Sequence, residues 1–165
     1  MSSTPSTGEL TIRRATPGDL SAVMRMFDEL AELQEGWRVF TPRTDLRGEM
    51  LRRYGADLAD PDALLVVAEL SGEIVGMAAG HVHRPSAFSD ELAVELGSVF
   101  VVPEHRGRGV AGALTAEVAR FARARGVERI TLKTFAQNEE ALVVWQKLGF
   151  EPRMVQMTAP VDRLA

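Results

Sequence analysis

With 165 residues, no cysteine and three histidines, the chain has the length of one domain and cannot form disulfides, thiolate metal sites or a cysteine nucleophile. Three histidines also make a histidine-based metal site improbable, so we expect no metal. The net charge of −4 argues against a nucleic-acid-binding surface.

The N-terminal residues 1–8 are rich in serine and threonine and lack the apolar run of a signal peptide, so we expect a short disordered leader there. No apolar stretch approaches the roughly 20 residues that a membrane span needs. We therefore expect a single domain over residues 9–160 in a cytoplasmic protein that binds neither membrane nor nucleic acid.

The first elements in chain order are a strand and two helices. The alternation in Leu10–Arg13 predicts the strand. Thr16 and Pro17 then have the pattern of an N-cap and a first helical position, and apolar residues recur at helical spacing until Gly36. A second start of this kind at Thr41 predicts another helix.

Three strands are expected next. Ala63–Leu70 is almost continuously apolar, which is typical of a strand buried on both faces. Ser71 and Gly72 predict a tight turn into a second strand over 73–84, so these two strands should form an antiparallel hairpin. Leu92–Val102 is expected to be the third strand.

The last elements are a helix, a strand, a helix and a strand. Helical spacing begins at Val110 and continues to Gly126. Val127–Phe135 predicts a strand, Asn138–Leu148 a helix, and Arg153–Thr158 a terminal strand. The order β-α-α-β-β-β-α-β-α-β predicts an α+β fold with a mixed, mostly antiparallel sheet.

The loop Arg106–Ala111 lies between an expected strand and an expected helix. A helix N-terminus has unpaired N–H groups and a positive dipole end, so it suits an anion such as a diphosphate. Gly107 and Gly109 let the main chain approach phosphate oxygens closely. An ordinary turn with solvated arginines is the alternative for the hexapeptide alone. A P-loop nucleotide binder is a remote alternative, because no Gly-Lys-Ser/Thr follows the loop.

Two segments carry a resemblance to a known family. Val99–Leu114 (VFVVPEHRGRGVAGAL) resembles motif A of the GNAT superfamily of N-acetyltransferases, and 138–150 (NEEALVVWQKLGF) resembles its motif B. Ile12–Asp19 is similar to the usual opening of that family, so the resemblance spans residues 10–158. It implies the GNAT fold, direct transfer of acetyl from acetyl-CoA to a primary amine of a small molecule or peptide, and, as is common in the family, a homodimer.

The resemblance also implies which residues hold the cofactor. The main chain of the strand before the loop would pair with the pantetheine arm, and the N–H of Val99 would polarise the thioester carbonyl. Asn138, which could also be only a helix N-cap, would contact the CoA arm. The implied cofactor-binding residues are Val99, Phe100, Val101, Arg106, Gly107, Arg108, Gly109, Val110, Ala111 and Asn138.

Glu95 is the candidate general base. An alkylammonium must lose a proton before its nitrogen attacks, and family members that use a strand glutamate carry it at this position relative to the loop. We expect Glu95 to share a strand face with Val99, four residues later. His81 and His83 on the preceding strand are the alternatives, and Glu95 could also be only a polar residue at a solvent edge.

Trp145 departs from the family pattern, which often has a tyrosine there as the acid that protonates the leaving thiolate. An indole N–H is not an acid at any relevant pH. Tyr54, the only tyrosine, is not placed near the sulfur by the sequence, so the general acid is unassigned and solvent could protonate the thiolate. This departure favours the alternative hypothesis, a non-catalytic acyl-CoA-binding module for sensing or assembly.

The acceptor would enter between the 36–43 connection and the 85–91 loop, opposite the pantetheine end of CoA. Carboxylates there would suit a cationic amine and aromatic rings its carbon skeleton. The sequence does not name the acceptor. The candidate substrate-binding residues are Trp37, Phe40, Phe88, Asp90 and Glu91.

Overall fold

The computed structural model describes residues 8–37, 41, 43–84 and 90–164. The expected leader therefore lies outside the described residues except for Gly8, and Phe40 and Phe88 lie outside them too. The chain divides into two compact units, Met1–Lys133 and Thr134–Ala165, which we describe separately. The single domain over 9–160 stays a prediction.

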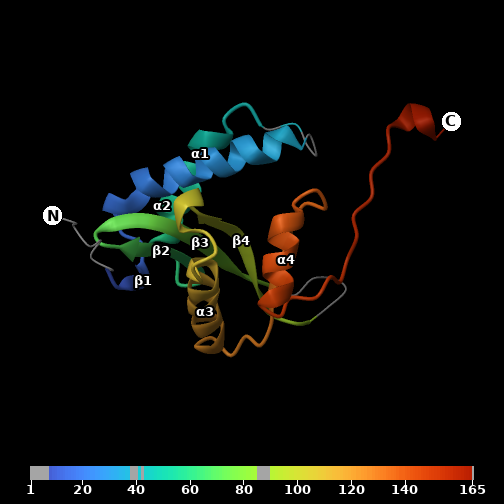
Figure 1. Cartoon of the computed structure of the whole chain (residues 1–165). Coiled ribbons are helices and arrows are strands. Elements are labelled where there is room, and N and C mark those ends of the chain that lie inside the picture. The colour runs from blue at the N-terminus through green and yellow to red at the C-terminus, as the bar shows by residue number, and fades with distance from the viewer. Residues whose placement is uncertain (1–7, 38–40, 42, 85–89, 165) are drawn as a thin grey trace. The chain divides into compact units, whose positions relative to one another are not determined.

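The first unit is built on a mixed sheet (Figure 1). Its strands lie in the order β1-β2-β3-β4-β5, antiparallel up to β4, while β5 runs parallel to β4. Ser71 and Gly72 both have positive φ (53° and 85°), as expected for the tight hairpin turn between β2 and β3. The strands are β1 (Leu10–Arg14), β2 (Ala63–Leu70), β3 (Glu73–His83), β4 (Ala93–Val101) and β5 (Ile130–Leu132).

Helices cover both faces of this sheet (Figure 1). α1 (Leu20–Gly36) and α2 (Leu46–Asp57) pack on one face through a core of apolar side chains. α3 (Val110–Arg123) lies on the other face, where its leucine and valine side chains approach two small glycines of β3. Burial of these apolar side chains is the main stabilising contribution to the unit. The core on the α1 and α2 face is Val23, Met24, Met26, Phe27, Tyr54, Leu65, Val67, Met77, Ala79 and Phe100.

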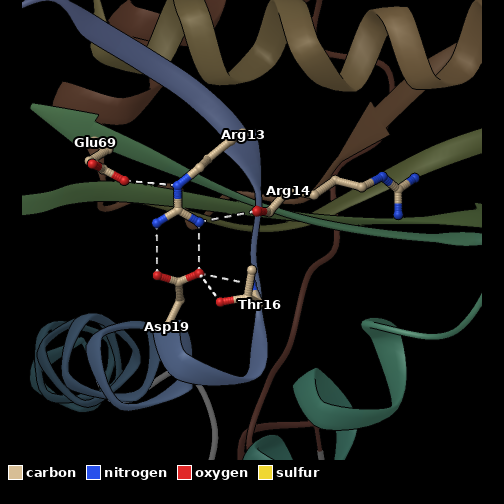
Figure 2. A network of polar contacts seen from close by, with 5 residues as sticks. All are labelled: Arg13, Arg14, Thr16, Asp19 and Glu69. Atoms are coloured by element: carbon tan, nitrogen blue, oxygen red, sulfur yellow. Dashed lines mark hydrogen bonds and ion pairs between the residues drawn. The ribbon is translucent and has the colours of Figure 1, made fainter. Parts of the chain in front are cut away.

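A charged network joins β1 to the start of α1 (Figure 2). Arg13 forms a bidentate pair with Asp19 (2.8 and 3.0 Å) and donates from Nε to Glu69 on β2 (2.8 Å). Thr16 caps a short 3-10 turn, Pro17–Asp19, through a capping box with the same carboxylate. The Arg13 guanidinium therefore holds the pKa of Asp19 well below its usual range.

The second unit contains α4 (Glu139–Lys147) and a short 3-10 turn at Val161–Arg163. The expected strand over Arg153–Thr158 is wrong, because within the described part of this unit residues 151–160 form neither helix nor strand. A strand needs a partner for its main-chain groups, and here the side chains of Met154 and Met157 stay 90% and 88% exposed.

Other elements begin or end at residues different from those predicted, but the fold is of the predicted α+β class. α1 begins at Leu20, after the 3-10 turn, and α2 begins at Leu46 and not near Thr41. The strand expected over 127–135 is only β5, since Val127 still donates its N–H to Ala122 at the end of α3. Among the described residues, no helix is long and apolar enough to cross a bilayer.

Candidate active site

The loop between β4 and α3 adopts a conformation that requires glycine. Gly107 and Gly109 have φ of 71° and 81°, and Gly109 is the N-cap of α3. A Cβ at either position would meet nothing within 4 Å. The glycines are therefore needed for the left-handed backbone, and the space above them is open.

The main-chain donors of this loop form a cradle that could hold an anion. The N–H groups of Val110, Ala111 and Gly112 begin α3 and have no intrahelical partner. No acceptor for the N–H groups of Gly107, Arg108 or Gly109 occurs among the described residues. Consecutive free donors at a helix N-terminus, around left-handed glycines, bind phosphate groups.

Arg106 differs from the rest of the loop. Its main-chain N–H already donates to the carbonyl of Pro103 (3.2 Å). Its side chain turns back to the strand, where Nε donates to the Val101 carbonyl (3.0 Å) and the guanidinium lies 5.5 Å from the Phe100 ring centroid. The free cradle therefore begins at Gly107.

A bulge separates β4 into two parts. Ala79 pairs with Ser98 but Gly80 pairs with Leu96, so Gly97 is an extra residue on β4. The parallel pairing with β5 also stops at Leu96. Beyond this point β4 is an edge with β3 as its partner strand in the sheet.

The main-chain groups of Val99 and Val101 point away from β3. Val102 donates its N–H to Val75 of β3 (3.0 Å), and hydrogen-bonded positions alternate along an antiparallel pair. By this alternation Phe100 bonds to β3, while Val99 and Val101 present their N–H groups to the open edge, as an extended ligand would require. Phe100 contributes a buried ring to the core.

Glu95 lies before the bulge, on the α1 and α2 face of the sheet. Its Oε1 accepts from Lys133 Nζ (3.1 Å), its Oε2 lies 3.9 Å from His83 Nδ1, and its side chain is 33% exposed. The expectation that Glu95 and Val99 share a strand face is wrong. The extra residue Gly97 reverses the alternation, so that Ser98 points to the face of Glu95 and Val99 to the opposite face.

His81, one of the alternative bases, has both ring nitrogens engaged. Its Nε2 lies 2.8 Å from Asp57 Oδ1, and its Nδ1 lies 3.2 Å from an Arg53 nitrogen. Because arginine only donates hydrogen bonds, Nδ1 accepts from Arg53. Nε2 then carries the hydrogen and donates to Asp57 Oδ1. Both ring nitrogens of His81 thus have partners, as both carboxylate oxygens of Glu95 do, and Glu95, His81 and His83 all stay candidates for the base.

Two polar groups connect α2 to the sheet. Asp57 is 4% exposed, and its Oδ2 has no hydrogen-bond partner among the described residues. The Tyr54 hydroxyl, 1% exposed, donates to Ser98 Oγ beside the bulge (3.0 Å). Burial raises the pKa of the Tyr54 hydroxyl, so it stays protonated and acts as a donor.

The predicted acceptor-binding residues are only partly described. Trp37 follows α1 and is half-buried, whereas Asp90 and Glu91 are exposed just before β4. Glu91 pairs with Arg129 (3.3 Å). Phe40 and Phe88 lie outside the described residues. In the part of the chain that the structure describes, no group of three or more His, Cys, Asp or Glu residues could hold a metal ion.

In the second unit, Asn138 is the N-cap of α4. Its Oδ1 accepts from the N–H of Ala141 (3.1 Å), which leaves its amide NH2 group without a partner among the described residues. Trp145 packs edge-to-face on Phe150, with ring centroids 5.5 Å apart. Asn138 therefore serves as a cap and keeps donors for a further contact.

Sequence reasoning missed Lys133, Ser98 and Asp57. Each reaches the site through contacts between elements far apart in the chain, Lys133 with Glu95 and Ser98 with Tyr54. No signal in the sequence indicated Lys133, because only the parallel pairing of β5 with β4 places it on the face of Glu95. None existed for Asp57, an ordinary charged residue on an amphipathic helix.

Known proteins resemble this chain over most of its length. The acetyltransferase (GNAT) family matches residues 27–150. The acetyltransferase plu1384 of Photorhabdus laumondii is 36% identical over 129 residues, which are 77% of this chain and 81% of that protein.

Solved structures share the fold, as the sequence predicted. The aminoglycoside N-acetyltransferase AAC(6')-Iy in complex with CoA has a TM-score of 0.77 at 23% identity, covering 95% of this chain and 97% of its own. A transcriptional regulator from Bacillus halodurans has a TM-score of 0.73 at 26% identity, covering 92% and 99%. The family match spans well over half of the sequence, and we conclude that this protein belongs to the GNAT family of acetyltransferases.

Proposed function

We propose that the protein transfers the acetyl group of acetyl-CoA directly to a primary amine of a small molecule or peptide. The observation that carries this proposal is the succession of two sets of unused main-chain N–H groups, those of Val99 and Val101 on the open edge of β4 and those of the cradle at the start of α3. A ligand with an extended amide-containing arm and a pyrophosphate matches both sets. AAC(6')-Iy, which shares the fold, was solved with CoA.

The donor roles follow from these groups. The N–H groups from Gly107 to Ala111 would hold the pyrophosphate, and Val99 and Val101 would pair with the amides of the pantetheine arm. The Val99 N–H would stabilise the oxyanion that develops on the thioester carbonyl. Asn138 would contribute its free NH2 group to the cofactor.

The acceptor roles belong to side chains. Glu95 would take the proton of the incoming ammonium, after which the amine nitrogen bonds to the carbonyl carbon and the carbon–sulfur bond breaks. The nitrogen would lose its second proton to solvent and the thiolate would take a proton from solvent, since the indole N–H of Trp145 is not an acid at any relevant pH. Trp37, Phe40, Phe88, Asp90 and Glu91 would bind the acceptor.

A panel of amines tests the proposal. The protein is incubated with acetyl-CoA and, in turn, aminoglycosides, polyamines, amino acids and peptides with free N-termini, and CoA release is followed. At least one amine should drive release, and the same amine should drive none with the Gly109→Glu variant. Aminoglycosides come first because AAC(6')-Iy acts on that class.

The second candidate function, a non-catalytic acyl-CoA-binding module, is favoured by the single feature of Trp145 in place of tyrosine. Calorimetry with acetyl-CoA separates the two candidates. Tight binding without turnover of any amine would replace the enzyme proposal with the binding module. A cytoplasmic location and a homodimer stay predictions from the sequence, to be tested by cell fractionation and analytical ultracentrifugation.

A further inference from the structure

Lysine is rare in this chain. The 19 basic residues include only two lysines, Lys133 and Lys147, so few primary amines are present besides the N-terminus. Lys133 directly follows β5 and its side chain is 87% exposed. A protein proposed to act on primary amines therefore carries one of its own directly after the last strand of its sheet.

Lys133 is bound to the candidate base. Its Nζ lies 3.1 Å from Oε1 of Glu95, so the ammonium and carboxylate form the pair that an acceptor amine would form with its base. His83 approaches the other carboxylate oxygen, at 3.9 Å. Lys133 thus occupies the same contact that the proposed reaction requires of its substrate.

Lys133 also lies where β4 and β5 part. The last pair of these strands is Leu96 with Leu132, so Lys133 is level with Gly97 in the bulge. Val99 follows two residues later, about 7 Å along an extended strand. A lysine side chain that rotates about its four carbons can move from Glu95 towards the N–H proposed to hold the acetyl carbonyl.

We propose that Lys133 is a self-acetylation site, modified by the acetyl group bound to the same molecule; this inference rests on the proposed function. Lys133 Nζ gives one proton to Glu95 and attacks the thioester carbonyl carbon. The nitrogen–carbon bond forms, the carbon–sulfur bond breaks, and the second proton lost by the nitrogen passes through water to the departing thiolate, while Glu95 returns its own proton to solvent. The acetylated side chain is neutral, so its ion pair with Glu95 ends and the carboxylate is released to external amines.

Self-acetylation of Lys133 can be tested with Lys147 as an internal control. The full chain is incubated with acetyl-CoA and no acceptor, and acetylation at Lys133 and Lys147 is followed over time by mass spectrometry of peptides. Lys147 is also exposed, so it reports spontaneous acetylation. We expect acetylation of Lys133 to be faster by about tenfold or more, because a base and a bound donor act only there. The rate constant should not depend on protein concentration.

Three variants identify the cause. Gly109→Glu removes the cradle and Glu95→Gln removes the base, and each should reduce acetylation of Lys133 to the rate of Lys147. Lys133→Arg keeps a cation beside Glu95 but has no amine, and should show no acetyl group at that position. Equal rates at the two lysines, or an unchanged Lys133 rate in Gly109→Glu, would overturn the inference.

The amine panel, run on the same preparation, distinguishes this inference from the proposed function. Turnover of an external amine with Lys133 unmodified overturns self-acetylation and leaves the proposed function standing. A protein that does not bind acetyl-CoA overturns both.

Discussion

Two regions of the candidate site differ in the groups that they offer, main-chain groups in one and side chains in the other. The donor edge, which we define as Val99–Val101 with the loop Gly107–Ala111, offers main-chain groups, and its sequence matters mainly where the backbone needs glycine. The acceptor face, which we define as Glu95, His83 and Lys133, offers side chains that bind one another. Changes at the donor edge should therefore affect cofactor binding, and changes on the acceptor face should affect turnover.

The largest expected effect is at the donor edge. In Gly109→Glu a side chain and a negative charge enter the open space above the cradle, so acetyl-CoA binding should be lost. Calorimetric titration measures it. The matched control is Gly126→Glu at the other end of α3, where φ is 67° and a Cβ also meets nothing within 4 Å. If both variants lose affinity equally, backbone strain and not the cradle is responsible.

The second largest effect is expected for a substitution on the acceptor face. Glu95→Gln keeps the shape of the side chain but removes the carboxylate that we propose as the base, so kcat should fall about 100-fold while the affinity for acetyl-CoA is retained. Steady-state kinetics across pH with the best amine, together with calorimetry, provide the readout. Glu73→Gln, an exposed carboxylate at the start of β3, serves as the control. Unchanged kcat in Glu95→Gln would remove this residue from the mechanism.

The third prediction concerns the stability of the fold, through the ion pair between Arg13 and Asp19. Asp19→Asn weakens the pair with Arg13 and should lower the free energy of unfolding by about 2 kcal/mol, since charge-assisted hydrogen bonds are lost. Because the pKa of Asp19 is lowered in the folded state, this stabilisation is present above a pH of about 4 and is lost as the pH falls through the folded-state value.

Urea unfolding at neutral and acidic pH measures both effects of Asp19→Asn. The difference between wild type and variant should shrink towards low pH, and acetyl-CoA affinity at 25 °C should stay the same. A difference that grows on acidification would contradict the assigned role of the Arg13 pair.

The smallest effect is expected where α2 meets the bulge. Tyr54→Phe keeps the edge-to-face contact with Phe27 but loses the hydrogen bond to Ser98, which should cost about 1 kcal/mol of stability. A double-mutant cycle with Ser98→Ala tests the pairing, because the two losses should not add. Additive effects would mean that the two hydroxyl groups act independently.

The donor edge could be predicted from the sequence because its signals are local. Glycines at 107 and 109 followed by helical spacing from Val110 indicate free N–H groups at a helix start, and the structure places them so. The α+β class also followed from the order of elements, each of which has its own apolar period.

The acceptor face could not be predicted in the same way, because it depends on contacts between elements far apart in the sequence. Lys133 meets Glu95 only through the parallel pairing of β5, and His81 is engaged by residues of α2. The terminal strand expected from Arg153 onwards failed for a related reason, since apolar alternation does not supply a partner strand.

The bulge at Gly97 has a consequence for how this chain tolerates change in its length. A Cβ at Gly97 would meet only the Ala79 carbonyl oxygen, at 4.0 Å, and its φ is not left-handed, so Gly97→Ala should be accommodated. Deletion of the same residue would remove the bulge, yet Leu96 could stay opposite Gly80 and Ser98 opposite Ala79, so Ser98 and Val99 would keep their faces of the sheet. The strand should therefore tolerate both a substitution at Gly97 and its loss, whereas insertion of one further residue in the paired part of β4 would reverse the faces of the side chains that follow it.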